Sequence, residues 1–131
     1  MSEVKVKTQV NNSKELAEEK VSVAYLNAIK SSQLKIIKLT RNLIGLPVEE
    51  VLVKLKFCNL KVAAPVRELV YSAMSNAENN HNMDVDNLFI KRIDVGKSFV
   101  LKRFRARARG RSSQILKRFS NIRVVLVEKQ N

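Results

Sequence analysis

An alternating run of arginine near the C-terminus limits the folds open to this chain more than any other segment. Residues 103–111 read RFRARARGR, with arginine at every second position and uncharged residues between. Because successive side chains of a β-strand point to opposite faces, one continuous strand would place five guanidinium groups along one side. These like charges repel one another, so the segment needs dense negative charge beside it to become ordered.

The segments on both sides of this run have the two-residue period of β-strands. LFIKRIDV and KSFVLKRF precede it, and IRVVLVEK follows it. Gly110 is the only glycine between residues 97 and 131, which makes it the best candidate for a hairpin reversal. A strand over the 19 residues 88–106 would be about 60 Å long at roughly 3.3 Å per residue. We therefore predict a long hairpin whose outer part, about residues 97–120, protrudes from the core.

The first part of the chain predicts one strand and three helices. Residues 21–30 read as a strand, and the next helix follows Ser31 and Ser32 and ends at Gly45. A second helix opens at Pro47, with its buried stripe formed by Val48, Val51, Leu52 and Leu55. A third helix covers about 60–80, with Pro65 in its first turn and small inward residues such as Ala73 and Ala77. The predicted fold is α+β, in the order β-α-α-α-β-β.

Length and composition predict one intracellular domain. The first 20 residues are polar and mixed in charge, so we expect a flexible N-terminal segment followed by a single domain over 21–131. Neither an apolar signal core nor a run of about 18–20 apolar residues is present, so we expect no membrane contact. The single cysteine, Cys58, excludes an internal disulfide and fits a reducing compartment.

Charge is distributed very unevenly along the chain. The net charge is +13, and residues 87–131 carry 13 basic residues against 2 acidic ones. Between residues 97 and 123 no acidic residue occurs, and the ten basic ones are Lys97, Lys102, Arg103, Arg105, Arg107, Arg109, Arg111, Lys117, Arg118 and Arg123. Such a block indicates a polyanionic partner, most commonly nucleic acid, and its arginines suit bidentate contact with phosphate. A solvated basic tail is the alternative; a membrane surface would need larger apolar residues between the arginines.

Candidate catalytic or metal-binding residues are few. The only histidine, His81, lies in a polar segment expected to be a surface turn. Asp84 and Asp86 have the spacing of paired carboxylates but fit a turn cap better. Ser112 and Ser113 follow a basic segment and fit either a kinase site or contacts with phosphate oxygens. We therefore predict no catalytic site, no metal, no cofactor and no small-molecule substrate.

Several motifs resemble the family of large ribosomal subunit protein twenty-two, in its bacterial or mitochondrial type and with an α-proteobacterial character. They are SAMSNAENN at 72–80, VDNLFIKRIDVGKSFVLKRF at 85–104, RARGR at 107–111, I-x-K at 115–117 and SNIRVVLVE at 120–128. The resemblance extends over about 21–128. It implies three helices on a small antiparallel sheet, and a hairpin that penetrates the RNA of the large subunit. It also implies a role in subunit assembly, with the hairpin tip in the wall of the polypeptide exit tunnel.

The resemblance assigns roles to particular residues. It implies contacts with ribosomal RNA by Lys35 and by the ten basic residues of 97–123, of which Lys102, Arg103, Arg105, Lys117 and Arg118 lie on the hairpin arms. It implies that Arg107, Ala108, Arg109, Gly110 and Arg111 form the tip, where nascent chains pass. The sequence departs from the family pattern at Gln33, at the residues that flank Gly45, at Ala106 and at Asn121.

These observations predict a structural constituent of the large ribosomal subunit without enzymatic activity. Its expected partners are large-subunit ribosomal RNA, neighbouring ribosomal proteins and the nascent polypeptide. A bacterial cytoplasmic ribosome is the expected location, and a mitochondrial matrix ribosome is the alternative. The rival function is a non-ribosomal RNA chaperone or regulator that uses the same basic arm.

Overall fold

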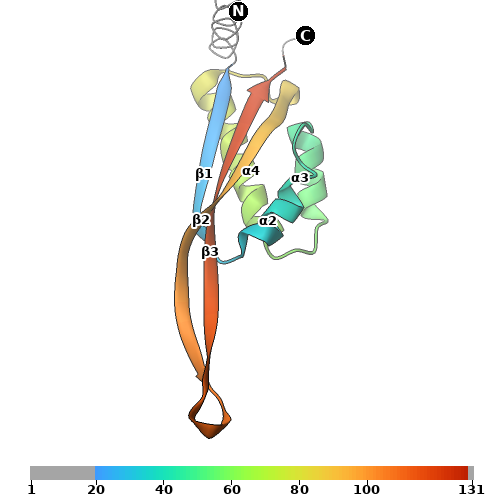
Figure 1. The fold of residues 1–131 in the computed structure, drawn as a ribbon. Helices are drawn as coiled ribbons and strands as arrows, with labels where there is room; N and C mark the ends of the chain where they lie inside the picture. Colours follow the sequence, from blue (N-terminus) through green and yellow to red (C-terminus); the bar gives the residue numbers. More distant parts are fainter. Residues whose placement is uncertain (1–19, 130–131) are drawn as a thin grey trace, which may run out of the picture.

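The computed structural model describes residues 20–129 and has the predicted order of elements (Figure 1). Its strands are β1 (Val21–Ile29), β2 (Leu88–Ala106) and β3 (Ser112–Glu128), and its helices are α2 (Gln33–Thr40), α3 (Val48–Lys56) and α4 (Ala63–His81). Short 3-10 turns, η1 (Val85–Asn87) and η2 (Ala108–Gly110), precede β2 and follow it. The N-terminal segment predicted to be flexible lies outside the described residues, except for residue 20.

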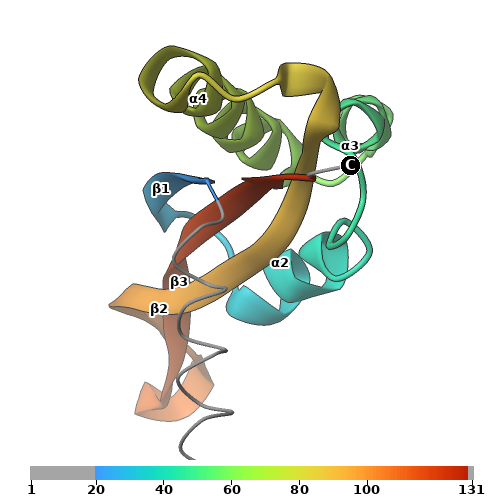
Figure 2. The ribbon, with the colours of Figure 1, turned by 90° about the horizontal axis from the view of Figure 1, so that it is seen from above.

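The three strands form an antiparallel sheet in the order β1-β3-β2, and the helices pack on one of its faces (Figure 2). Successive side chains of a strand point to opposite faces of the sheet, and paired residues on neighbouring strands share a face. The residues of the face that meets the helices supply the sheet side of the core. These are Ala24 of β1, Leu88, Ile90 and Ile93 of β2, and Ile122, Val124 and Leu126 of β3. The fold class predicted from the sequence is confirmed.

Helix α4 lies close to β1 because its inward residues are small. Ala73 and Ala77 are fully buried, and the Ser22 hydroxyl donates a hydrogen bond to the Ala73 carbonyl at 2.8 Å. A larger side chain at either alanine would hold the helix away from the strand. Pro65 is the third residue of α4, so it lies in the first turn as predicted, where its missing N–H leaves no helical bond unmade.

Helix α2 is shorter than predicted. It ends at Thr40, whereas the spacing of apolar residues predicts a helix up to Gly45. Residues 41–45 form a turn, after which the chain makes hydrogen bonds with β2: the Gly45 N–H donates to the Ile90 carbonyl at 2.8 Å, and the Ile90 N–H donates to the Leu46 carbonyl at 3.1 Å. Gly45 has the expected positive φ of 82°, but it closes this turn rather than a helix. Tertiary pairing with the sheet therefore replaced the last helical turn.

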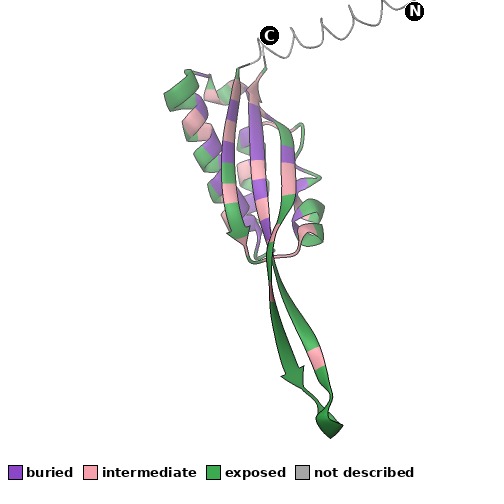
Figure 3. Ribbon diagram, turned by 60° about the vertical axis from the view of Figure 1, so that its left-hand side comes forward, coloured by how far each residue is buried: buried purple, intermediate pink, exposed green. Residues whose placement is uncertain are grey.

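The paired strands β2 and β3 continue past the body as the predicted protruding hairpin (Figure 3). A register shift between Lys97 and Val100 marks the point of departure, which we call the neck (residues 97–99 and 119–120). Phe99 and Phe119 stack there with ring centroids 4.4 Å apart, and the Ser120 hydroxyl donates to the Ser31 carbonyl at 2.9 Å. Bulges bend and twist a ribbon, so this one sets the direction of the arm (residues 100–106 and 112–118).

Candidate nucleic-acid interface

The tip of the hairpin (residues 107–111) is a tight turn built from two consecutive left-handed residues. Arg109 has φ 56° and ψ 39°, and Gly110 has φ 70°. The Arg111 N–H donates to the Ala108 carbonyl at 3.4 Å, and the Arg107 N–H donates to the Arg111 carbonyl at 2.7 Å. A positive φ at both central residues is what a type I′ turn requires, and the twist of such a turn matches that of the flanking strands. The predicted reversal at Gly110 is confirmed.

The arm carries basic residues on both of its faces. Val100 pairs with Arg118 and Lys102 with Leu116, so these four side chains share one face. On the other face, Leu101 pairs with Lys117, Arg103 with Ile115 and Arg105 with Ser113. The five arginines of the opening motif thus do not form a single edge. Arg103 and Arg105 lie on the arm, whereas Arg107, Arg109 and Arg111 belong to the tip.

No carboxylate among residues 20–129 pairs with a basic residue of the arm or tip. On the body, ion pairs join Lys54 to Glu50 at 2.7 Å and Arg92 to Asp94 at 3.1 Å. Local contacts of the outer arginines are with neutral groups: Arg103 donates to the Lys102 carbonyl, and Arg107 donates to the Ser113 hydroxyl at 3.4 Å. The positive charge of the hairpin is therefore available to an anionic partner.

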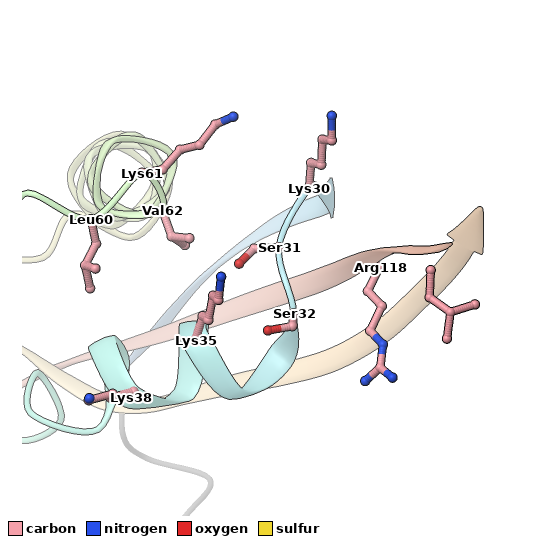
Figure 4. Close-up of a pocket in the computed structure, with 10 residues that line it drawn as sticks. Lys30, Ser31, Ser32, Lys35, Lys38, Leu60, Lys61, Val62 and Arg118 are labelled. Carbon is pink, nitrogen blue, oxygen red and sulfur yellow. The ribbon is translucent and has the colours of Figure 1, made fainter. Parts of the chain in front are cut away.

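A second group of basic residues surrounds a hollow on the body beside the neck (Figure 4). The hollow has a volume of about 540 Å³. Its basic residues come from four separate parts of the chain and are Lys30, Lys35, Lys38, Lys61 and Arg118. We call it the basic hollow; no acidic residue lines it.

Sequence reasoning named two members of the basic hollow, Lys35 and Arg118, and missed the other three. Lys38 follows Lys35 by one helical turn, so the spacing within α2 was a usable signal. Lys30 and Lys61 belong to loops that are far apart in sequence. Only the tertiary structure brings these loops together.

The remaining basic residues of the prediction take two different places. Lys97 lies at the neck, exposed and close to the arm. Arg123 lies apart from the arm, on the open face of the sheet, with its guanidinium carbon 5.5 Å from the centre of the Tyr25 ring. It is only partly exposed, and its buried Nε has no hydrogen-bond partner. The structure thus groups Arg123 with β1 rather than with the hairpin.

The residues considered above as catalytic candidates lie at the end of a helix and in a capped turn. His81 is exposed and is the last residue of α4, where a surface turn was expected. The helix includes it because Asn82 takes the left-handed cap conformation one residue later. The Asp84 carboxylate accepts hydrogen bonds from the Asp86 N–H and the Asn87 amide, which confirms the turn-cap interpretation.

Two features are absent from residues 20–129. Histidine, cysteine and acidic side chains do not gather in threes as a metal site requires. No described helix is both long and apolar enough to cross a membrane.

Comparison with known proteins identifies the family to which this fold belongs. The family model of ribosomal protein L22p/L17e matches residues 24–127, which include every strand and helix described above in whole or in large part. The chain belongs to this family. The resemblance carried by the sequence motifs is therefore confirmed.

Individual relatives agree with this assignment. The chain is 44% identical over 82% of its length to the large ribosomal subunit protein uL22 of Phenylobacterium zucineum, covering 85% of that protein. It is 46% identical over 86% of its length to the uL22 of Zymomonas mobilis, covering 89% of that protein. Relatives of this kind come from α-proteobacteria, as the motifs predict. The family is structural and non-enzymatic, and this chain is a structural constituent of the large ribosomal subunit.

Proposed function

We propose that this chain binds large-subunit ribosomal RNA through its arm and tip and thereby supports subunit assembly. The observation that carries the proposal is the exposed hairpin, which has basic residues on both faces and no acidic residue from 97 to 123. A ribbon charged on both faces can contact phosphates on two sides at once. It can therefore hold together RNA segments that approach it from different directions.

The choice of basic residues fits close contact with RNA. Seven of the ten basic residues between 97 and 123 are arginine, whose planar guanidinium binds phosphate through two hydrogen bonds and also stacks on bases. The small side chains between the arginines, such as those of Ala106 and Ala108, would allow RNA to approach the ribbon closely. The hydroxyls of Ser112 and Ser113 would add hydrogen bonds to phosphate oxygens.

We further propose that the tip forms part of the wall of the polypeptide exit tunnel and meets nascent chains. The tip lies at the far end of the hairpin from the helices (Figure 1), where a ribbon threaded between RNA segments would reach furthest into the subunit. The uL22 relatives from bacteria favour a ribosome of the bacterial cytoplasm as the location. A ribosome of the mitochondrial matrix is the alternative.

Salt dependence of RNA binding tests the RNA-binding role of the arm. With about six single-strand-like phosphate contacts, the slope of log K against log salt should be near −4, at about 0.7 per contact. Replacing two arm residues by Arg103→Gln and Arg105→Gln should make this slope shallower by about 1.4. Lys56→Gln with Arg67→Gln removes the same charge from α3 and α4 and should leave the slope unchanged. A slope near zero for the unaltered chain would contradict RNA binding.

Co-sedimentation separates the ribosomal role from that of a free RNA chaperone or regulator. The labelled chain should stay with large subunits through a sucrose gradient at high salt, because it would be enclosed by RNA rather than held at the surface. Release into the light fractions, together with normal binding to free RNA, would favour the non-ribosomal alternative.

A further inference from the structure

A second concave site lies on the side of the neck that faces the start of α2. It has a volume of about 340 Å³ and adjoins the basic hollow, since Ser32, Leu116 and Arg118 line both. Its lining combines four apolar side chains, Leu34, Val100, Leu116 and Phe119, with three basic ones, Lys97, Lys102 and Arg118. We call it the neck groove.

The apolar lining of the neck groove is unusually accessible to solvent. Leu34 has 78% of its surface exposed and Leu116 has 43%. Phe119 stacks on Phe99, which holds the Phe119 ring in a fixed position at the wall of the groove. Apolar side chains exposed together in a concave site mark a place where a partner is bound.

The charges around the groove indicate the chemistry of that partner. Lys97, Lys102 and Arg118 line it together, no acidic residue does, and no carboxylate among the described residues pairs with any of the three. The ligand must therefore offer an apolar, flat or compact surface beside negative charge. A nucleotide has this combination: its base is a hydrophobic ring and its phosphates carry the charge.

We propose that the neck groove binds the base of an unpaired RNA nucleotide, with Lys97, Lys102 and Arg118 on the adjoining phosphates. The base would contact Leu34, Leu116 and Phe119, and the strand would continue across Arg118 into the basic hollow. This assignment rests on the proposed RNA-binding function and adds that the RNA at the neck is single-stranded. A base-paired duplex keeps the faces of its bases stacked inside and presents only its backbone and polar base edges, so it would offer no base face to the apolar lining of the groove.

Direct binding to short probes tests this inference with the full chain. The probes are a uridine octamer and a ribose-phosphate octamer of equal charge that has no bases. The unaltered chain should bind the uridine octamer about tenfold more tightly, since a base that stacks on an aromatic ring adds to the affinity from phosphate contacts. Equal affinity for the two probes would overturn the proposal, because phosphate contact alone would then explain binding.

Variants locate the base contact in the groove. Leu34→Ser, at an exposed position that does not threaten folding, and Phe119→Leu should each weaken binding of the uridine octamer by about three- to tenfold. Neither should change binding of the base-free octamer. Ile37→Ser is the matched control, since Ile37 is an exposed apolar residue of the same helix that does not line the groove. The proposal is wrong if Leu34→Ser acts like Ile37→Ser, or if both probes lose affinity equally.

The outcomes also separate this inference from the proposed function. If Arg103→Gln with Arg105→Gln lowers affinity for large-subunit ribosomal RNA while the groove variants have no effect on the octamer, RNA binding by the arm stands and the base site fails. If a glutamate octapeptide displaces the uridine octamer at equal concentration, the groove takes an acidic peptide and the proposal fails. If Arg103→Gln with Arg105→Gln instead leaves the affinity for large-subunit ribosomal RNA unchanged, the proposed function fails.

Discussion

At the scale of single residues, the tip depends on a backbone conformation that L-amino acids seldom adopt. Arg109 and Gly110 both have positive φ, and only the glycine does so without strain. Nothing lies within 4 Å of the position where a Cβ would be added at Gly110. The requirement for glycine is therefore one of backbone conformation and not of space.

Gly110→Ala should loosen the tip turn by about 1 kcal/mol, the usual cost of a left-handed L-residue. The measurement is amide exchange of the Arg107 N–H, which donates to the Arg111 carbonyl and should exchange roughly fivefold faster. Gly96→Ala is the matched control, because Gly96 also has free space around it but lacks a positive φ. Equal exchange in the two variants would show that the turn does not depend on φ at residue 110.

Asn121, one of the residues that depart from the family pattern, has a structural role. Its side-chain oxygen accepts a hydrogen bond from the Ala28 N–H at 2.9 Å. Ala28 has a positive φ of 59° and lies where the register of β1 and β3 shifts. The asparagine therefore stabilises the irregular end of β1 beside the neck, a role that its position in the sequence does not reveal.

At the scale of elements, β2 and β3 each consist of two parts, which differ in the contacts that stabilise them. Between residues 88 and 96, β2 lies against β3 and the helices and contributes buried residues such as Ile90. Beyond the neck, the same two strands pair only with each other, and the arm contributes no residue to the core. A two-stranded ribbon alone is marginally stable in water, so the arm should open far more easily than the body.

Hydrogen exchange should resolve this difference. In the free protein, cross-strand amides of residues 100–118 should exchange at least tenfold faster than those of the body strands. Binding to large-subunit ribosomal RNA should slow exchange in 100–118, because phosphates neutralise the like charges that oppose order. Protection of this segment that is the same with and without RNA would contradict an arm ordered by its partner.

At the scale of the whole molecule, the hydrophobic core and the protruding hairpin, to which we assign most of the RNA contacts, are separate parts of the chain. The core consists of residues from β1, the three helices and the body parts of β2 and β3, and none comes from 98–119. The protruding hairpin instead carries most of the basic residues of the C-terminal part. Because much of the net charge of +13 lies on this hairpin, repulsion between the positive charges weakens the body less than it would if the charges surrounded the core.

Replacing residues 98–119 by Asn-Gly should therefore leave the body folded. Lys97 and Ser120 are paired across the strands, and Asn-Gly forms the two-residue turn that closes such a pair. The free energy of unfolding in urea should change by no more than about 1 kcal/mol, whereas affinity for ribosomal RNA should fall steeply. A loss of cooperative unfolding would show that the arm is needed for the fold.

Much of this architecture was predictable because local patterns and tertiary contacts agree. In α3, the glutamates of the first turn, the lysines of the last turn and the stripe of Val48, Val51 and Leu55 all indicate the same helix. The strand period and Gly110 likewise predict the hairpin and its reversal. The end of α2 was not predictable, because hydrogen bonds of Gly45 and Leu46 with Ile90 compete with the last helical turn.

By itself, the sequence determined the order of the elements, the long basic hairpin and the family, since these follow from periodicity, charge and motifs along the chain. Only the tertiary structure decided how the basic residues are grouped. Pairing of β2 with β3 divided them between two faces of the arm, and folding brought Lys30 and Lys61 beside Lys35. The neck groove also arises this way, because Leu34 and Phe119 are far apart in sequence and meet only where α2 begins beside the hairpin.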